Sequence, residues 1–112
     1  MASLAAALRS PPSEKLTREN YLIWKAQILL SLRGAEVMGL LDGSDPAPAK
    51  TLEAEDGEKK TVPNPAYSAW NSRNQAVLGF LNKSMSPDVL AQVFDLEHAA
   101  DVWSAIINLF SS

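Results

Sequence analysis

The last part of the chain carries its apolar residues at the spacing of an α-helix. They recur at positions i, i+3, i+4, i+7 and i+11, which lie on one helical face: Ala99, Val102, Trp103, Ile106 and Phe110. Alternation with a period of two, which is typical of half-buried strands, is absent throughout the sequence. The pattern therefore predicts a chain built from helices, with the last helix running from about Glu97 to the end.

Two segments nearer the N-terminus also predict helices. The first spans about residues 20–33, and apolar side chains cover most of its circumference, so we expect it to be buried on more than one side. Asn20 is suited to cap its start, and Gly34 is suited to end it in the left-handed conformation. A short second helix is expected over residues 35–41.

Two proline-containing motifs mark further helix starts. Asn64-Pro65 places a capping side chain before a proline at the first helical position, which predicts a long helix to about residue 83. Ser86-Pro87 repeats this pattern and predicts a short helix. Together these segments predict an all-α fold, a small bundle of about five helices of which two are short.

Two stretches lack apolar periodicity, and they set the expected domain organisation. We expect a disordered tail over residues 1–13 and a single helical domain over residues 14–112, with a long flexible loop at 42–64. Proline, glycine and charged residues in that loop cannot repay the entropy lost when a backbone is ordered. No apolar run approaches the ~18 residues that span a bilayer, so we expect a soluble chain with no membrane partner.

Composition argues against several classes of function. A formal net charge of −3, with Lys59-Lys60 as the only basic pair, predicts no strong binding of nucleic acid. The absence of cysteine excludes disulfides, thiol catalysis and zinc knuckles. It also fits a reducing compartment, and we expect a cytoplasmic protein.

The three tryptophans, Trp24, Trp70 and Trp103, allow two interpretations. Exposed indoles would stack on a ligand or line a peptide groove. All three lie on predicted apolar stripes, however, and an indole buries a large area while its N–H finds a backbone acceptor. We therefore predict that they pack in the core.

His98 is the only histidine, and three acids lie near it in sequence. A metal site is one interpretation of this cluster. The favoured one is that Asp95 and Glu97 lie at a helix start, where acidic groups interact well with the helix dipole. No nucleophile accompanies the histidine and no glycine-rich phosphate loop occurs, so we predict no catalytic residue, cofactor, metal or small-molecule substrate.

Three stretches form a distinctive series of motifs. The first, at residues 15–25, reads KLTRENYLIWK, and the second, at residues 40–46, reads LLDGSDP. The third, at residues 64–110, begins with NPAYSAW and later contains AADVW. In this order they resemble the N-terminal region of copia-type retrotransposon Gag proteins, over residues 16–110. The motif residues that the resemblance assigns to the core are Leu16, Asn20, Tyr21, Trp24, Lys25, Trp70 and Trp103.

The resemblance implies a non-enzymatic structural or interaction protein of a transposable element, with a capsid-like fold. Gag proteins self-associate into a shell that encloses the element's RNA, so the implied partners are the chain itself or other Gag chains. In the family, further helices and often a zinc knuckle follow this region. We therefore expect the chain to be truncated at its C-terminus. A host-retained binding module and a non-functional remnant of an element are the alternatives.

The end of the last predicted helix suggests where association would occur. Its apolar side chains have no following segment to cover them, and exposed apolar patches tend to acquire a partner. We predict a concentration-dependent dimer across a two-fold axis, built mainly from this helix. The residues of this predicted interface are Ile106, Ile107, Leu109 and Phe110.

Overall fold

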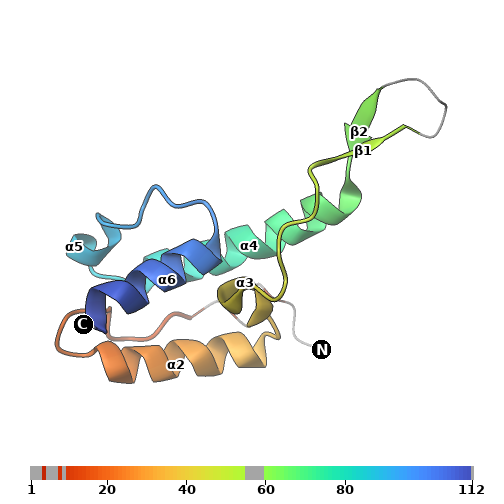
Figure 1. The fold of residues 1–112 in the computed structure, drawn as a ribbon. Helices are drawn as coiled ribbons and strands as arrows, with labels where there is room; N and C mark the ends of the chain where they lie inside the picture. The colour runs from red at the N-terminus through yellow and green to blue at the C-terminus, as the bar shows by residue number, and fades with distance from the viewer. Residues whose placement is uncertain (1–3, 5–7, 9, 55–59, 112) are drawn as a thin grey trace.

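Five helices and one short β-hairpin make up the part of the chain that the computed structural model describes, residues 4, 8, 10–54 and 60–111 (Figure 1). The elements in chain order are α2 (Tyr21–Gly34), α3 (Gly39–Asp42), β1 (Thr51–Glu53), β2 (Thr61–Pro63), α4 (Pro65–Lys83), α5 (Pro87–Leu90) and α6 (Ala99–Phe110). The prediction of a mainly helical chain with two short helices is confirmed. The prediction of a purely α-helical fold is wrong, because β1 and β2 form an antiparallel sheet.

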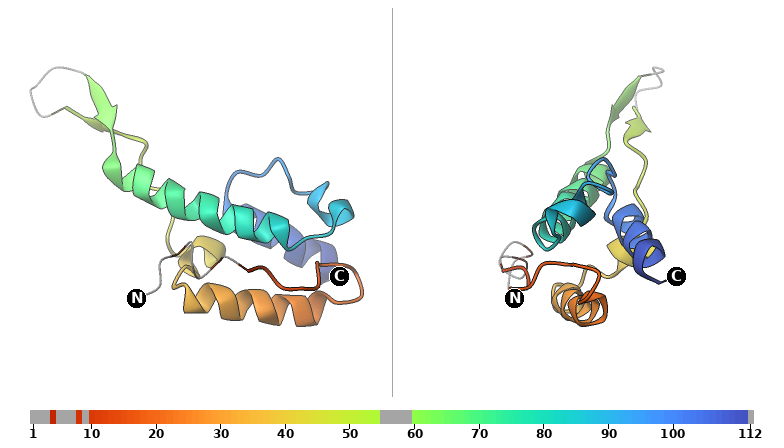
Figure 2. Two further views of the ribbon diagram at one scale, coloured as in Figure 1. Left: turned by 180° about the vertical axis from the view of Figure 1, so that it is seen from behind. Right: turned by 90° about the vertical axis from the view of Figure 1, so that its left-hand side faces the viewer.

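The three longest helices form the body of the molecule. Helix α6 packs against α3 and α4, and α2 lies below both α4 and α6 in the end-on view of Figure 2. The extended segment that precedes α2 runs through the angle between α2 and α4. Because α4 continues past the other helices and carries the hairpin, the molecule is elongated, at 58 × 33 × 21 Å.

The core is built where these three helices meet. Helix α2 contributes Trp24, Ile28 and Leu32, which are fully buried and spaced at i, i+4 and i+8. Val77 and Leu81 from α4 are equally buried. Only one face of α2 is used in this way, so the prediction that it is buried on more than one side is wrong. The reason is its position at the edge of the bundle.

The segment before α2 is fastened to the C-terminal end of α4 through the backbone of Ser84. The carbonyl oxygen of this buried residue accepts hydrogen bonds from the Leu16 N–H (2.9 Å) and from the Trp24 indole N–H (2.8 Å). The Ser86 N–H then donates to the Leu16 carbonyl at 3.2 Å. Of the tail expected to be disordered, residues 1–3, 5–7 and 9 lie outside the described residues, while Leu8 is 8% exposed and belongs to the core.

The segment expected to be a flexible loop at 42–64 contains both strands of the hairpin. Thr51 pairs with Pro63, and all six strand residues are exposed. The stem of the hairpin is held by two contacts to α4: the Asn64 side-chain amide donates to the Ala49 carbonyl (2.7 Å), and the Trp70 indole donates to the Asp45 carbonyl (2.8 Å). Residues 55–59, within this loop, lie outside the described part of the chain.

The helix boundaries confirm some of the expected caps and correct others. Asn64 caps α4 as predicted, since its side-chain oxygen accepts from the Ala66 N–H. Asn20 stands at the start of α2, but its side chain bonds to residues that precede the helix. Its side-chain oxygen accepts from the Thr17 N–H, and its amide N–H donates to the Lys15 carbonyl. Gly34 is the last residue of the helix and does not adopt the left-handed conformation expected of it.

Each turn flanking α3 contains one residue in the left-handed backbone conformation, and neither of these residues is Gly34. Glu36 has φ 60°, and Gly43 has φ 83° at the end of α3. The second helix is therefore shorter than the predicted 35–41. The Ser44 N–H donates to the Asp42 carboxylate at 2.8 Å, and this backbone hydrogen bond lowers the pKa of Asp42. The LDG motif thus ends α3 in two ways. The Asp42 side chain accepts a hydrogen bond from the backbone of the following turn, and Gly43 occupies a left-handed position that favours glycine.

Candidate interaction surface

Five of the seven motif residues expected in the core are buried, whereas Asn20 and Lys25 are only half-buried. Leu16, Trp24, Trp70 and Trp103 are 0%, 1%, 4% and 7% exposed. The rings of Trp24 and Trp103 stack with their centroids 5.9 Å apart, which joins α2 to α6. The prediction that the three tryptophans pack in the core is confirmed, so none of them offers a stacking surface to a ligand.

His98 contacts other side chains of the fold. Its ring meets the edge of Trp70 at 5.2 Å between centroids, and its Nδ1 lies 4.0 Å from the Asp101 carboxylate. The cap of α6 comes from neither Asp95 nor Glu97 but from the buried Asn74 of α4, whose side-chain oxygen accepts from the Ala99 N–H. In residues 4, 8, 10–54 and 60–111, no three side chains gather in a way that would hold a metal ion.

The interface predicted at the end of α6 is only partly accessible. Ile106 is fully buried because α6 packs against α3 and α4, so it cannot contact a partner. Ile107, Leu109 and Phe110 are half-buried. The Phe110 ring stacks on Tyr21 of α2 at 5.2 Å between centroids. The exposed edge of this group, rather than the group as predicted, remains available for contact.

The largest exposed apolar side chains with a common location lie instead on α2. Leu22, Ile23 and Leu30 are 77%, 69% and 67% exposed, and the exposed Ala26 lies between them. Their spacing of i, i+1, i+4 and i+8 places them on one side of the helix, opposite the side that enters the core. We call these four residues the outer face of α2. Figures 1 and 2 show that no other described element covers this side of α2.

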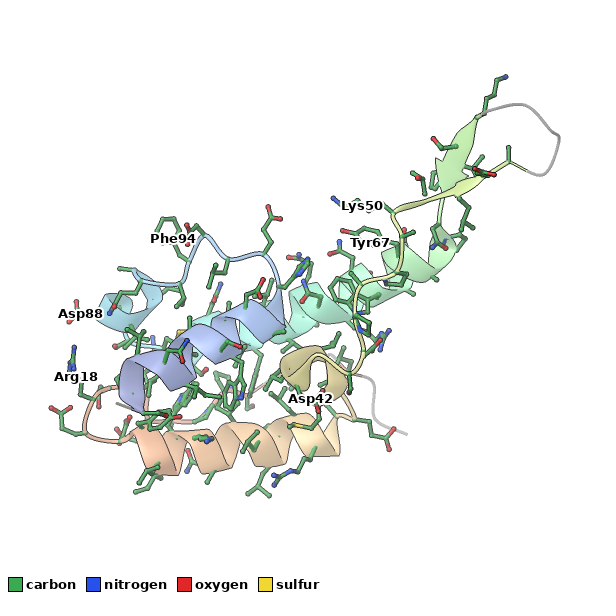
Figure 3. The ribbon with its side chains drawn as sticks, in the orientation of Figure 1. Arg18, Asp42, Lys50, Tyr67, Asp88 and Phe94 are labelled. Carbon is green, nitrogen blue, oxygen red and sulfur yellow. The ribbon has the colours of Figure 1, made fainter. Side chains whose placement is uncertain are left out.

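A hollow of about 640 Å³ continues the outer face at the N-terminal end of α2. Leu22 and Ile23 line it together with Phe110 from α6, and the charged residues Arg18 and Glu19 form its rim. Figure 3 shows Arg18 at this end of the molecule, pointing away from the body. The accessible part of Phe110 is therefore continuous with the outer face of α2.

The sequence of α2 alone does not predict this surface. Apolar positions all around the helix indicate burial on several sides. The opposite interpretation requires knowing that α2 lies at the edge of the bundle, which depends on how the rest of the chain packs.

A second hollow, of about 660 Å³, runs between α4 and the segment that leads into α6. Tyr67, Asn71 and Gln75 line one wall, and Phe94 lies near the other. Phe94 is 69% exposed and points outward from the loop between α5 and α6, on the side of the molecule away from α2 (Figure 3). Its polar lining combines side-chain amides with the carboxylates of Asp95 and Glu97 and the imidazole of His98. No serine, threonine or cysteine is among the lining residues, so the histidine has no such nucleophile beside it there.

The fold and its surface thus define a small, mainly helical protein that carries an exposed apolar helix face. No helix in the described residues has both the length and the apolar character needed to cross a bilayer.

Comparison with known proteins indicates where a protein of this class originates. The chain is 30% identical over 100 residues to the retrovirus-related Pol polyprotein from transposon RE2 of Arabidopsis thaliana, and 30% identical over 102 residues to that from transposon RE1. Each alignment covers 88% of this chain but only 6% of the polyprotein. No family model and no solved structure matches. The similarity indicates a retrotransposon-derived protein, related to a small part of these long polyproteins.

Proposed function

We propose that the chain is a Gag-like structural unit of a copia-type retrotransposon, which acts without catalysis by associating with itself or with other Gag chains. The observation that carries this proposal is the outer face of α2. Its three large apolar side chains are each more than two-thirds exposed, while the opposite side of the same helix builds the core. A monomeric protein rarely leaves such side chains together on one exposed face unless a partner covers them.

The similarity to transposon polyproteins also supports this proposal. Their names describe transposon polyproteins, and the motif order at residues 15–25, 40–46 and 64–110 resembles the Gag region of such elements. The buried motif residues, such as Leu16 and the three tryptophans, hold the helices together. The outer face of α2, in contrast, supplies the contact between chains.

Sedimentation equilibrium across a wide concentration range tests this proposal. We expect the average mass to rise above the 12.1 kDa of the monomer as concentration increases. Leu30→Ser should reduce this association, because it places a hydroxyl in the apolar contact.

Phe94→Ser provides the matched control. Phe94 is as exposed as Leu30, at 69% against 67%, but it lies on the opposite side of the molecule. We expect the Phe94 variant to associate like the parent chain. Monomers at every concentration, both alone and mixed with a longer Gag chain, would contradict the proposed function.

A further inference from the structure

Two of the large side chains of the outer face of α2 are placed symmetrically about its smallest member, Ala26. Leu22 and Leu30 are equally far from Ala26 along the helix, one turn on either side. If a second copy of α2 packs antiparallel, with a two-fold axis through Ala26, each Leu22 meets the Leu30 of the other copy. Ala26 then faces its own counterpart, where a methyl group lets the two helices approach closely.

The charges that flank this face follow the same symmetry. Glu19, in the bend just before α2, and Arg33, in its last turn, are also equally far from Ala26 in sequence, and both are exposed. Within the described residues neither has an ion-pair partner. Antiparallel packing places each Glu19 opposite the Arg33 of the other copy, whereas parallel packing would set like charges against each other.

From these observations we infer that the outer face of α2 is covered by the same face of a second copy of this chain, packed antiparallel about a two-fold axis through Ala26. The inference rests on the proposed function and specifies the surface by which copies meet. Flanking charges of both signs fit this partner better than they fit an anionic membrane surface, which selects faces bordered by Lys and Arg.

The size of the contact predicts a weak pair. A helix of 14 residues is about 21 Å long, so one helix pair lies at the small end of protein interfaces. The hollow that ends at Phe110 enlarges the contact at each end of the pair. The pair therefore forms and separates readily, and a covalent trap is the most direct way to detect it.

Ala26→Cys supplies that trap, because the natural chain contains no cysteine. Only a residue on a two-fold axis meets its own counterpart. Helix axes about 9–10 Å apart, with Cα atoms about 2.3 Å from each axis, bring facing Cα atoms to about 4.4–5.4 Å, within the ~4.4–6.8 Å range of disulfides. We expect mild oxidation to convert the Ala26→Cys chain to a disulfide-linked dimer at least about tenfold faster than it converts Ser104→Cys, a control with an exposed cysteine on α6. Equal rates would overturn the inference.

A charge exchange tests the orientation. Glu19→Lys and Arg33→Glu should each weaken the dimer about tenfold, since each replaces two attractive pairs by two repulsive ones. The double variant Glu19→Lys/Arg33→Glu should bind within about threefold of the parent, because it restores both pairs. A double variant weaker than either single variant would show that these residues do not face each other.

The two sets of experiments separate the two proposals. A chain that associates and loses association with Leu30→Ser, but gives neither the Ala26→Cys disulfide nor the charge rescue, retains the proposed function and overturns the antiparallel geometry. A chain that stays monomeric at every concentration, both alone and mixed with a longer Gag chain, overturns both.

Discussion

Asn74 illustrates how one buried polar side chain holds two elements together. Its amide is 1% exposed, donates to the Glu97 carbonyl at 2.8 Å, and accepts from the Ala99 N–H at 2.9 Å. The side chain from α4 therefore satisfies one of the free N–H groups at the start of α6, a task that helix ends usually give to a residue of their own segment.

Asn74→Ala should consequently destabilise the fold. The Ala99 N–H would lose its partner in the interior and the part-buried Glu97 carbonyl would lose its donor, so we expect the free energy of unfolding to fall by about 2–3 kcal/mol. Urea denaturation followed by circular dichroism measures this. Asn74→Asp keeps the acceptor for Ala99 and loses the donor to Glu97, so its stability should lie between those of the parent and the alanine variant. If Asn74→Ala unfolds at the same urea concentration as the parent, the capping role is refuted.

Elements differ in how well sequence predicts them, and α4 and α2 mark the two extremes. The start of α4 was predictable because capping is local: Asn64 and Pro65 act on N–H groups within the next turn. The bounds of α2 were nearly as predictable, but its environment was not. An embedded helix and a helix at the edge of a bundle can both carry apolar residues on all sides, and only the packing of the whole chain separates them.

The hairpin shows a different reason for failure. Every residue of β1 and β2 is exposed, so no inward-facing set of apolar residues exists to create an alternating pattern. Its order comes from contacts distant in sequence, such as the ion pair between Asp45 and Arg73 at 2.9 Å. Lys50 also lies 5.8 Å from the centre of the Tyr67 ring, and Figure 3 shows the two side by side at the base of the hairpin.

Replacing either of two glycines by alanine should change the free energy of unfolding, but in opposite directions. Gly43 ends α3 with φ 83°, where a Cβ is strained, so Gly43→Ala should lower the free energy of unfolding by about 1–2 kcal/mol. Gly79 lies inside α4 with open space around the position of a Cβ, so Gly79→Ala should raise it by about 0.5–1 kcal/mol. Thermal or urea unfolding measures both, and shifts in the same direction would refute the assigned backbone conformations.

At the scale of the whole molecule, the charge distribution bears on the choice of partner. The formal net charge of −3 disfavours the binding of phosphates. We therefore expect this chain to bind single-stranded RNA with a dissociation constant weaker than about 10⁻⁴ M at physiological salt. Fluorescence anisotropy of a labelled oligonucleotide measures it. Tight binding that weakens steeply with salt would contradict the expectation and indicate a role in contacting RNA.

The inward location of all three tryptophans has a spectroscopic consequence. Indole emission responds to the polarity around the ring, and the stacked pair Trp24 and Trp103 is withdrawn from water together with Trp70. Unfolding would move all three into water and shift the emission to longer wavelength. Contact at the outer face of α2 would leave their surroundings unchanged, because the residues of that face lie on the side of the helix away from the core. The intrinsic fluorescence of this chain thus reports whether it is folded and is insensitive to whether it is paired, so the two equilibria can be followed independently in one sample.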